Sequence, residues 1–216
     1  MGEKAEREGK KRSVGVPERL GDAPLRLIIV GHNPSEEAWR RGHVYAHPSN
    51  HVSFSWPLFS GNYLNPRYLM IQMWPILRKT GIAPPDQIRG CEDDDKMQSV
   101  AGVGFLDLGT GHPGTDSRQF GASHFAQWIP VFYERLRAHA ARASAAVGCR
   151  CGGRCGEPRL MAFSGKRQFL ELLNAGRKGK DRASGGATLC QQAGIPMTIS
   201  LAGVDGVVRS PGGFAG

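Results

Sequence analysis

The stretch Leu25-Arg-Leu-Ile-Ile-Val-Gly-His-Asn-Pro-Ser35 decides the fold of this chain. It opens with a short run of branched apolar residues, bounded by a proline and a glycine, which is typical of a buried β-strand. The turn-forming residues that follow lead to Ser35 and two glutamates. Acidic residues in a first turn complement the helix dipole, so this point predicts a helix start. The stretch therefore predicts a strand, a tight loop and a helix.

The same alternation continues along the chain. Hydrophobic periodicity predicts strands at Val100–Leu108, Leu160–Phe163 and Pro196–Leu201, a strand fragment at Gly206–Arg209, and helices at Ser123–Ala146 and Arg167–Leu173. This order predicts a three-layer α/β/α fold with a short, mostly parallel central sheet. Ligands of such sheets bind beyond the carboxyl ends of the strands. Three loops are expected there, at Gly31–Ser35, Gly109–Ser117 and Ser164–Lys166.

Length and composition fit one domain. The chain has 216 residues, of which 40% are hydrophobic and 22% are charged, as in ordinary globular proteins. No apolar run reaches the about 18 residues of a membrane helix, so we expect no membrane association. Residues 1–23 are expected to form a basic disordered tail, and residues 24–216 the domain. We expect a monomer.

The charge balance indicates an anionic partner. The formal net charge is +9, which favours nucleic acid over other partners. Most of the excess lies between Ala138 and Arg182, where ten basic residues face three acidic ones. The alternative is a solvated arginine-rich loop without a partner.

Three of the five cysteines, Cys149, Cys151 and Cys155, share one glycine-rich stretch. Zinc sites usually have four ligands in two separated pairs. A flexible reduced loop and a structural zinc site both remain open, and we expect no metal or other cofactor. No secretory signal is evident, which indicates a reducing intracellular compartment.

A glycine pattern suggests one alternative function. Gly109-Thr-Gly-His-Pro-Gly114 matches the G-x-G-x-x-G pattern of dinucleotide-binding oxidoreductases. That fingerprint requires a helix that opens within the motif and an acidic residue at the end of a second strand. Here the expected helix opens near Ser123, so this function is the weaker alternative.

Asn33 is the most informative polar residue of the first loop. Pro34 would hold it on a rigid turn, and its amide offers both an acceptor and donors. It could orient a water molecule, bind the polar edge of a ligand, or cap the next helix.

The surroundings of Asn33 resemble a known family. Ile29-Val-Gly-His-Asn-Pro-Ser35, followed by His43-Val-Tyr-Ala-His-Pro-Ser-Asn50, resembles the first active-site motif of the mismatch-specific uracil/thymine DNA glycosylases, a family of the uracil-DNA glycosylase superfamily. Gly102-Val-Gly-Phe-Leu-Asp107 and Phe163-Ser-Gly-Lys166 resemble two further family motifs and follow in the family's order. The resemblance covers roughly residues 25–173.

The resemblance implies a monofunctional DNA glycosylase. Such an enzyme flips uracil, or thymine mispaired with guanine, out of double-stranded DNA and hydrolyses its N-glycosidic bond, which initiates base excision repair. Asn33 matches the catalytic asparagine that positions the attacking water, and Asp107 is the second catalytic candidate. The implied substrate-binding residues are Gly31, His32, Pro34, Ser35, Asn50, Met73 and Phe54. The implied DNA-binding residues are Lys166, Arg167, Arg209 and Ser210. A nuclear location is expected, with an organelle as the alternative.

The chain departs from the family pattern at two points. Residues 52–72 separate Asn50-His51 from Met73-Trp74, which are adjacent in the family; we expect a foreign insertion, such as a retained intron, and the alternative is a lid over the pocket. The family's closing wedge loop is replaced by the degraded Arg209-Ser210-Pro211-Gly212. A catalytically inactive DNA-binding module of the same fold is therefore a further alternative.

Overall fold

The structure is a computed structural model that describes residues 15–50, 73–175, 178 and 198–200. Its centre is a sheet of four strands, β1 (Leu27–Gly31), β2 (Val103–Asp107), β3 (Leu160–Phe163) and β4 (Thr198–Ser200). The strands lie in the order β2-β1-β3-β4, and every neighbouring pair is parallel. The parallel sheet expected from the sequence is confirmed. The fifth strand expected at residues 206–209 lies outside the described residues.

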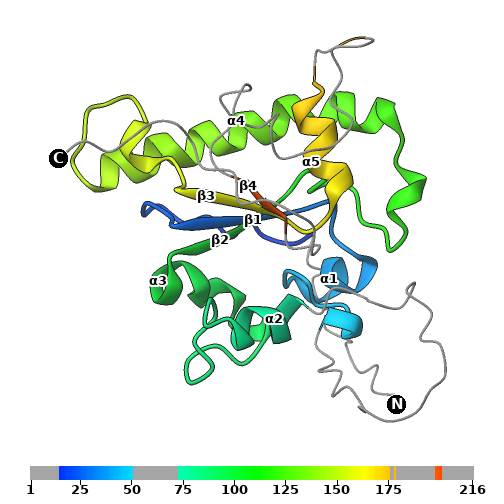
Figure 1. Ribbon diagram of the computed structural model, residues 1–216, viewed down its shortest axis with the longest axis horizontal. Helices are drawn as coiled ribbons and strands as arrows, with labels where there is room; N and C mark the ends of the chain where they lie inside the picture. The colour runs from blue at the N-terminus through cyan, green and yellow to red at the C-terminus, as the bar shows by residue number, and fades with distance from the viewer. Residues whose placement is uncertain (1–14, 51–72, 176–177, 179–197, 201–216) are drawn as a thin grey trace, which may run out of the picture.

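Helices cover both faces of the sheet (Figure 1). One face carries α1 (Glu36–Arg41), α2 (Met73–Lys79) and α3 (Met97–Ala101), and the other carries α4 (Ala122–Ala146) and α5 (Lys166–Leu173). Short 3-10 helices lie in the connections: η1 (Pro48–Asn50), η3 (Cys91–Lys96), η4 (Ser117–Gln119) and η5 (Arg154–Gly156). The three-layer α/β architecture is therefore confirmed. Among the described helices, none combines the length and the apolar character that crossing a membrane requires.

Strand β1 is buried on both faces and separates two hydrophobic clusters. Leu27 and Ile29 pack in the cluster that contains Trp74 of α2. Ile28 and Val30 pack in the cluster that contains Phe132 of α4. Alternation along a strand sends successive side chains to opposite faces. A continuous apolar run is therefore what a central strand between two helical layers requires.

Local signals explain three of the element boundaries. The Ser35 hydroxyl accepts a hydrogen bond from the backbone N–H of Ala38 at 3.1 Å, so Ser35 caps α1 as expected. The second strand starts later than expected, at Val103, because residues 97–101 form α3. Gly102 has a left-handed φ of 62°, which ends α3 and lets the chain enter β2 directly.

The fold begins earlier than the expected boundary at Pro24. Leu20 is fully buried beneath α4, and the carbonyl of Arg19 accepts the backbone N–H of Phe105 at 2.9 Å. The Arg19 guanidinium also pairs with the buried Asp94 carboxylate at 3.0 Å. Residues 15–23 are therefore part of the domain. Only Val16 and Leu20 of this segment bury apolar side chains, and two such residues are too few to give a hydrophobic pattern in the sequence. Residues 1–14 of the expected tail lie outside the described residues.

Replacing Leu20 tests this correction. Leu20→Ala should lower the free energy of unfolding by about 2–5 kcal/mol, because a buried leucine is lost and a cavity remains. Val131→Ala on the exposed side of α4, where the side chain is 50% exposed, is the matched control and should change it little. Chemical denaturation measures both. An unchanged stability of Leu20→Ala would place residues 15–23 outside the cooperative fold.

Candidate functional site

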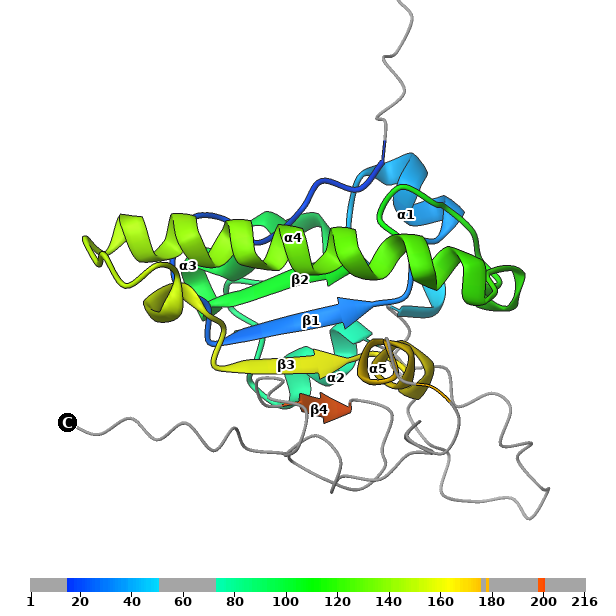
Figure 2. The ribbon, with the colours of Figure 1, turned by 90° about the horizontal axis from the view of Figure 1, so that it is seen from above.

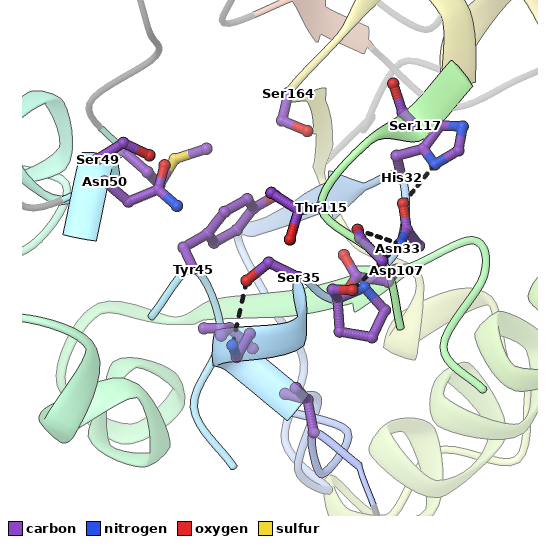
Figure 3. A pocket seen from close by; sticks show the side chains of 16 residues that line it. His32, Asn33, Ser35, Tyr45, Ser49, Asn50, Asp107, Thr115, Ser117 and Ser164 are labelled. Carbon is purple, nitrogen blue, oxygen red and sulfur yellow. Dashed lines mark hydrogen bonds between the residues drawn. The ribbon is translucent and has the colours of Figure 1, made fainter. Parts of the chain in front are cut away.

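A pocket of about 320 Å³ opens beyond the carboxyl ends of β1, β2 and β3 (Figure 3). Each of these strands contributes a polar residue to it at or just after its last residue: Asn33 after β1, Asp107 from β2 and Ser164 after β3. This position follows from the parallel sheet, in which all carboxyl ends meet at one edge. The pocket therefore lies where the sequence predicted a ligand site.

Most residues that the sequence nominated are gathered here. The pocket is lined by Asn33, Asp107, His32, Pro34, Ser35, Asn50 and Met73. Gly31 supports the pocket from β1, and Lys166 and Arg167 lie in the first turn of α5, which follows Ser164. Phe54, Arg209 and Ser210 lie outside the described residues. The sequence thus correctly predicted which described segments converge.

The side chain of Asn33 is fixed by a network of hydrogen bonds. Its amide nitrogen donates to the carbonyls of Pro34 at 3.1 Å, His112 at 3.0 Å and Gly114 at 2.9 Å. A carbonyl oxygen can only accept a hydrogen bond, so the end of the Asn33 amide that faces three carbonyls must be its nitrogen. The oxygen Oδ1 therefore points the other way, toward His32. Asn33 ties the first loop to the loop after β2 and does not serve as the helix cap, a role that Ser35 fills.

His32 holds the oxygen of Asn33. Nδ1 of His32 lies 2.7 Å from Asn33 Oδ1, and only a protonated Nδ1 can donate this bond. The ring packs among Phe120, Phe125 and Trp128 with centroid distances of 5.7, 5.2 and 5.6 Å. Burial lowers the pKa of His32 below its ordinary 6.5, so near pH 7 the ring is neutral with its proton on Nδ1. His32 therefore positions Asn33 and also lines the pocket, as expected.

Asp107 is the electrostatically unusual residue of the pocket. Burial raises the pKa of its carboxyl from 3.8 to about 6, although Arg135 acts in the opposite direction. Arg135 donates to the backbone carbonyl of Asp107 at 3.1 Å and leaves the carboxylate unpaired within the described residues. A carboxylate with a pKa near 6 is a proton acceptor at neutral pH. Perturbed acids of this kind concentrate in functional sites.

Gly31 explains how Asp107 fits against the sheet. The two residues are register partners on β1 and β2. A Cβ atom on residue 31 would lie 1.8 Å from Oδ1 of Asp107. Only glycine therefore leaves room for the carboxylate in its present position.

Tyr45 is a pocket residue that the sequence reasoning missed. Its hydroxyl is inaccessible to solvent and lies by the Ser164 side chain, whose interaction opposes a rise in the phenol pKa. Burial and the Asp107 charge both raise the pKa of the phenol, so it stays protonated. Its backbone has a φ of 50°, unusual for a residue other than glycine. Tyr45 lies within residues 43–50, which resemble the family's first active-site motif, and this resemblance could have identified it as a pocket residue.

Other missed residues come from expected loops and from the supposed tail. Thr115 and Ser117 line the pocket from the loop after β2, which the sequence placed at this edge without naming them. Val16 lines it from the segment that was assigned to the tail, and no sequence signal marked it.

Asn50 and Met73 both line the pocket although 22 residues lie between them in sequence. Asn50 ends η1 and Met73 begins α2, and these two helices are in contact. The described residues on either side of positions 51–72 thus both contribute to the pocket lining. The expected insertion at 52–72 itself lies outside the described residues.

The basic residues divide between two ends of the molecule. Arg167 is already engaged, since it donates to the Ser117 carbonyl at 3.0 Å and lies over the Phe125 ring at 5.1 Å from its centroid. Lys166 is exposed beside the pocket. Arg150, Arg154 and Arg159 precede β3 and therefore lie at the opposite end of the sheet. The dense basic stretch is not a single surface around the pocket.

The glycine pattern at 109–114 does not form a dinucleotide fingerprint. It is a loop, and α4 begins only at Ala122. Gly109 gives room to Trp128, whose ring would lie 2.7 Å from a Cβ at residue 109. The indole Nε1 of Trp128 donates to Nδ1 of His112 at 3.1 Å. These residues pack the loop against α4. No helix begins within the motif, so it offers no helix N-terminus to bind a pyrophosphate.

No model of a known protein family matches the chain, and no curated protein sequence matches it.

The raised pKa of Asp107 predicts how stability depends on pH. The folded state binds this proton more tightly than the unfolded state, whose aspartate titrates near 3.8. The carboxyl therefore destabilises the fold progressively as the pH rises from about 4 to about 6, and fully above about 6. Asp107→Asn should raise the melting temperature relative to the parent at about pH 7.5 and much less at about pH 4.

Asp86→Asn provides the control, because it makes the same chemical change at an exposed aspartate. Differential scanning calorimetry at both pH values measures the effect. An Asp107→Asn gain that is equal at the two pH values would contradict the raised pKa.

Proposed function

We propose that the protein is a DNA glycosylase that hydrolyses the N-glycosidic bond of uracil, or of thymine, mispaired with guanine. The observation that carries the proposal is the meeting of Asn33 and Asp107 at one pocket, with the Asn33 oxygen oriented and the Asp107 pKa raised to about 6. Figure 3 shows these two side chains next to each other. These are the two residues that the resemblance implicates in catalysis.

The oriented amide and the basic carboxylate suit the activation of a water molecule. Asn33 Oδ1 accepts one bond from His32 and keeps a second lone pair for a water. Asp107 would take the proton of that water as its oxygen bonds to the sugar carbon. The glycosidic bond breaks at the same carbon, and the base leaves with the electron pair. An amide is too weak a base for this work, so the proton acceptor must be Asp107.

The remaining lining suits a flipped pyrimidine. The carboxamide of Asn50 has no hydrogen bond to another described residue and can pair with the polar edge of a base. Met73 supplies an apolar wall, as the resemblance implies once residues 52–72 are set aside. Tyr45 offers a buried hydroxyl as a further donor.

The proposal is tested by release of the base. The protein should release uracil from a G·U duplex, and Asp107→Asn should lower the single-turnover rate by about 10² or more, the scale for loss of a positioned catalytic group. The parent rate should fall as the pH drops through about 6, because protonated Asp107 cannot accept a proton, and Asp107→Asn should lose this pH dependence. Gel analysis of abasic sites on G·U and G·T duplexes measures the rates.

Two further variants complete the test. Asp86→Asn should retain the parent rate. Asn33→Ala should lose excision to a similar degree, and also some thermal stability, because three loop carbonyls lose their donor. Excision by Asp107→Asn at the parent rate would remove Asp107 from the mechanism.

An inactive DNA-binding module is the second candidate. The observation in its favour is that the Asn33 amide already has a structural task, which ties two loops together and requires no catalysis. A protein that binds G·U duplexes but releases no base from either mismatch would favour this module over the hydrolase.

Salt dependence tests the proposed DNA partner. If Lys166 contacts a phosphate, log affinity should fall linearly with log salt, and Lys166→Gln should reduce this slope by about 0.9. Arg159→Gln removes an exposed charge at the opposite end of the sheet and should leave the slope unchanged. Fluorescence anisotropy with a labelled duplex measures both. Equal slopes for the parent and Lys166→Gln would exclude that contact.

A further inference from the structure

A second cluster of reactive side chains lies between α4 and β3. The free thiols of Cys149, Cys151 and Cys155 have their sulfur atoms within 4.8 Å of one another. The sulfurs of Cys149 and Cys155 are 3.1 Å apart. Zinc–thiolate bonds of about 2.3 Å in tetrahedral geometry require sulfur atoms about 3.8 Å apart. All three sulfur atoms already lie within 4.8 Å of one another, so small side-chain rotations suffice to reach this spacing and enclose an ion.

The backbone of the turn brings the sulfurs together. Gly152 and Gly153 adopt left-handed φ angles of 70° and 109°, which reverse the chain between the second and third cysteines. The backbone N–H of Cys155 donates to the sulfur of Cys151 at 3.1 Å. A sulfur accepts such a bond best as a thiolate, which is also the form that binds metals. The main-chain conformation therefore brings the three sulfur atoms together, in addition to the side-chain rotamers.

The turn is also fastened to α4. The N–H of Gly156 donates to the hydroxyl of Ser144 at 2.8 Å. A Cβ at residue 156 would lie 2.0 Å from the carbonyl oxygen of Ala140, so only glycine permits this close approach. The cysteine turn therefore occupies a defined position against the helix, contrary to the flexible loop that the sequence left open.

We propose that Cys149, Cys151 and Cys155 bind one zinc ion as a three-thiolate site, with water in the fourth position. Soft thiolate ligands select zinc over magnesium or calcium. Within the described residues, no fourth histidine, cysteine or carboxylate belongs to the cluster, and Cys155 is exposed to solvent. Three thiolates with Zn²⁺ carry a net charge of −1, and the exposed Arg150 and Arg154 beside the ligands offset it.

The position of the site indicates a structural role. The cysteine turn joins the end of α4 to the start of β3, at the opposite end of the sheet from the pocket (Figure 2). All three ligands lie in the connection itself, so a bound ion would close the turn and stiffen the link between α4 and β3. Because the ion is remote from Asn33 and Asp107, this proposal is independent of the glycosylase proposal.

Metal titration of the reduced full-length protein tests the site. One equivalent of Zn²⁺ should bind in competition with a chromophoric chelator, and Co²⁺ should give the intense visible bands and thiolate charge-transfer absorption of a tetrahedral sulfur site. The melting temperature should rise with free Zn²⁺, since the ion binds the folded state. Each of Cys149→Ser, Cys151→Ser and Cys155→Ser should weaken binding by more than the about 10–100-fold expected for loss of an outer-shell partner.

Cys91→Ala is the matched control. Cys91 is fully buried in the core beside α3, away from the cluster, and its loss should leave metal affinity and the cobalt spectrum unchanged. Absence of stoichiometric Zn²⁺ binding, a cobalt spectrum without thiolate bands, or equal weakening by Cys91→Ala would each overturn the proposal. So would a Cys149–Cys155 disulfide, found by mass spectrometry in metal-free protein isolated with alkylation of free thiols.

Discussion

The parallel register of β1 with its two neighbours is the constraint on which the site depends. Gly31 of β1 lies opposite Asp107 of β2, and Val30 lies opposite Phe163 of β3. This register brings the ends of three strands level, so that Asn33, Asp107 and Ser164 reach one pocket. A slip of one residue would turn every buried side chain of β1 to the other face. Two hydrophobic clusters pack against the opposite faces of β1 and hold it in this register. They therefore determine the geometry of the pocket and also stabilise the sheet.

Two polar residues of the pocket, Asn33 and Asp107, differ in how fully their side chains are hydrogen-bonded. The Asn33 amide is bonded on both ends, by three carbonyls and by His32, and this holds its oxygen in one direction. The Asp107 carboxylate lies close beside it, against Gly31, with a raised pKa. A rigid acceptor beside a carboxylate kept basic by burial is an arrangement suited to proton transfer. The buried Asp107 carboxylate also destabilises the fold at neutral pH, as functional sites commonly do.

The two ends of the sheet have different chemistry. The carboxyl end carries the pocket, the aromatic rings that surround His32, and the exposed Lys166. The opposite end carries the cysteine turn and the arginines on either side of its ligands. The basic excess that the sequence concentrates between residues 138 and 182 is therefore divided in space. Of its described members, Lys166 and Arg167 begin α5 next to the pocket, whereas Arg150, Arg154 and Arg159 lie at the opposite end of the sheet, so the total charge overstates the positive charge around the pocket.

The sequence by itself determined the layers, the parallel sheet and the segments that converge at the pocket. It could do so because strand, loop and helix signals are local, and because carboxyl ends of parallel strands must share an edge. It also singled out Asn33 and Asp107. The tertiary structure alone decided how these residues are used. The three carbonyls that bind Asn33 come from its own loop and from residues some 80 positions away. The raised pKa of Asp107 depends on burial that no local pattern reports. Residues 15–23 join the fold through partners on η3, β2 and α4, contacts that a polar composition conceals. The three cysteines were visible from the start, but only the glycine-built turn shows that their sulfurs meet, because spacing along a chain does not set distance in space.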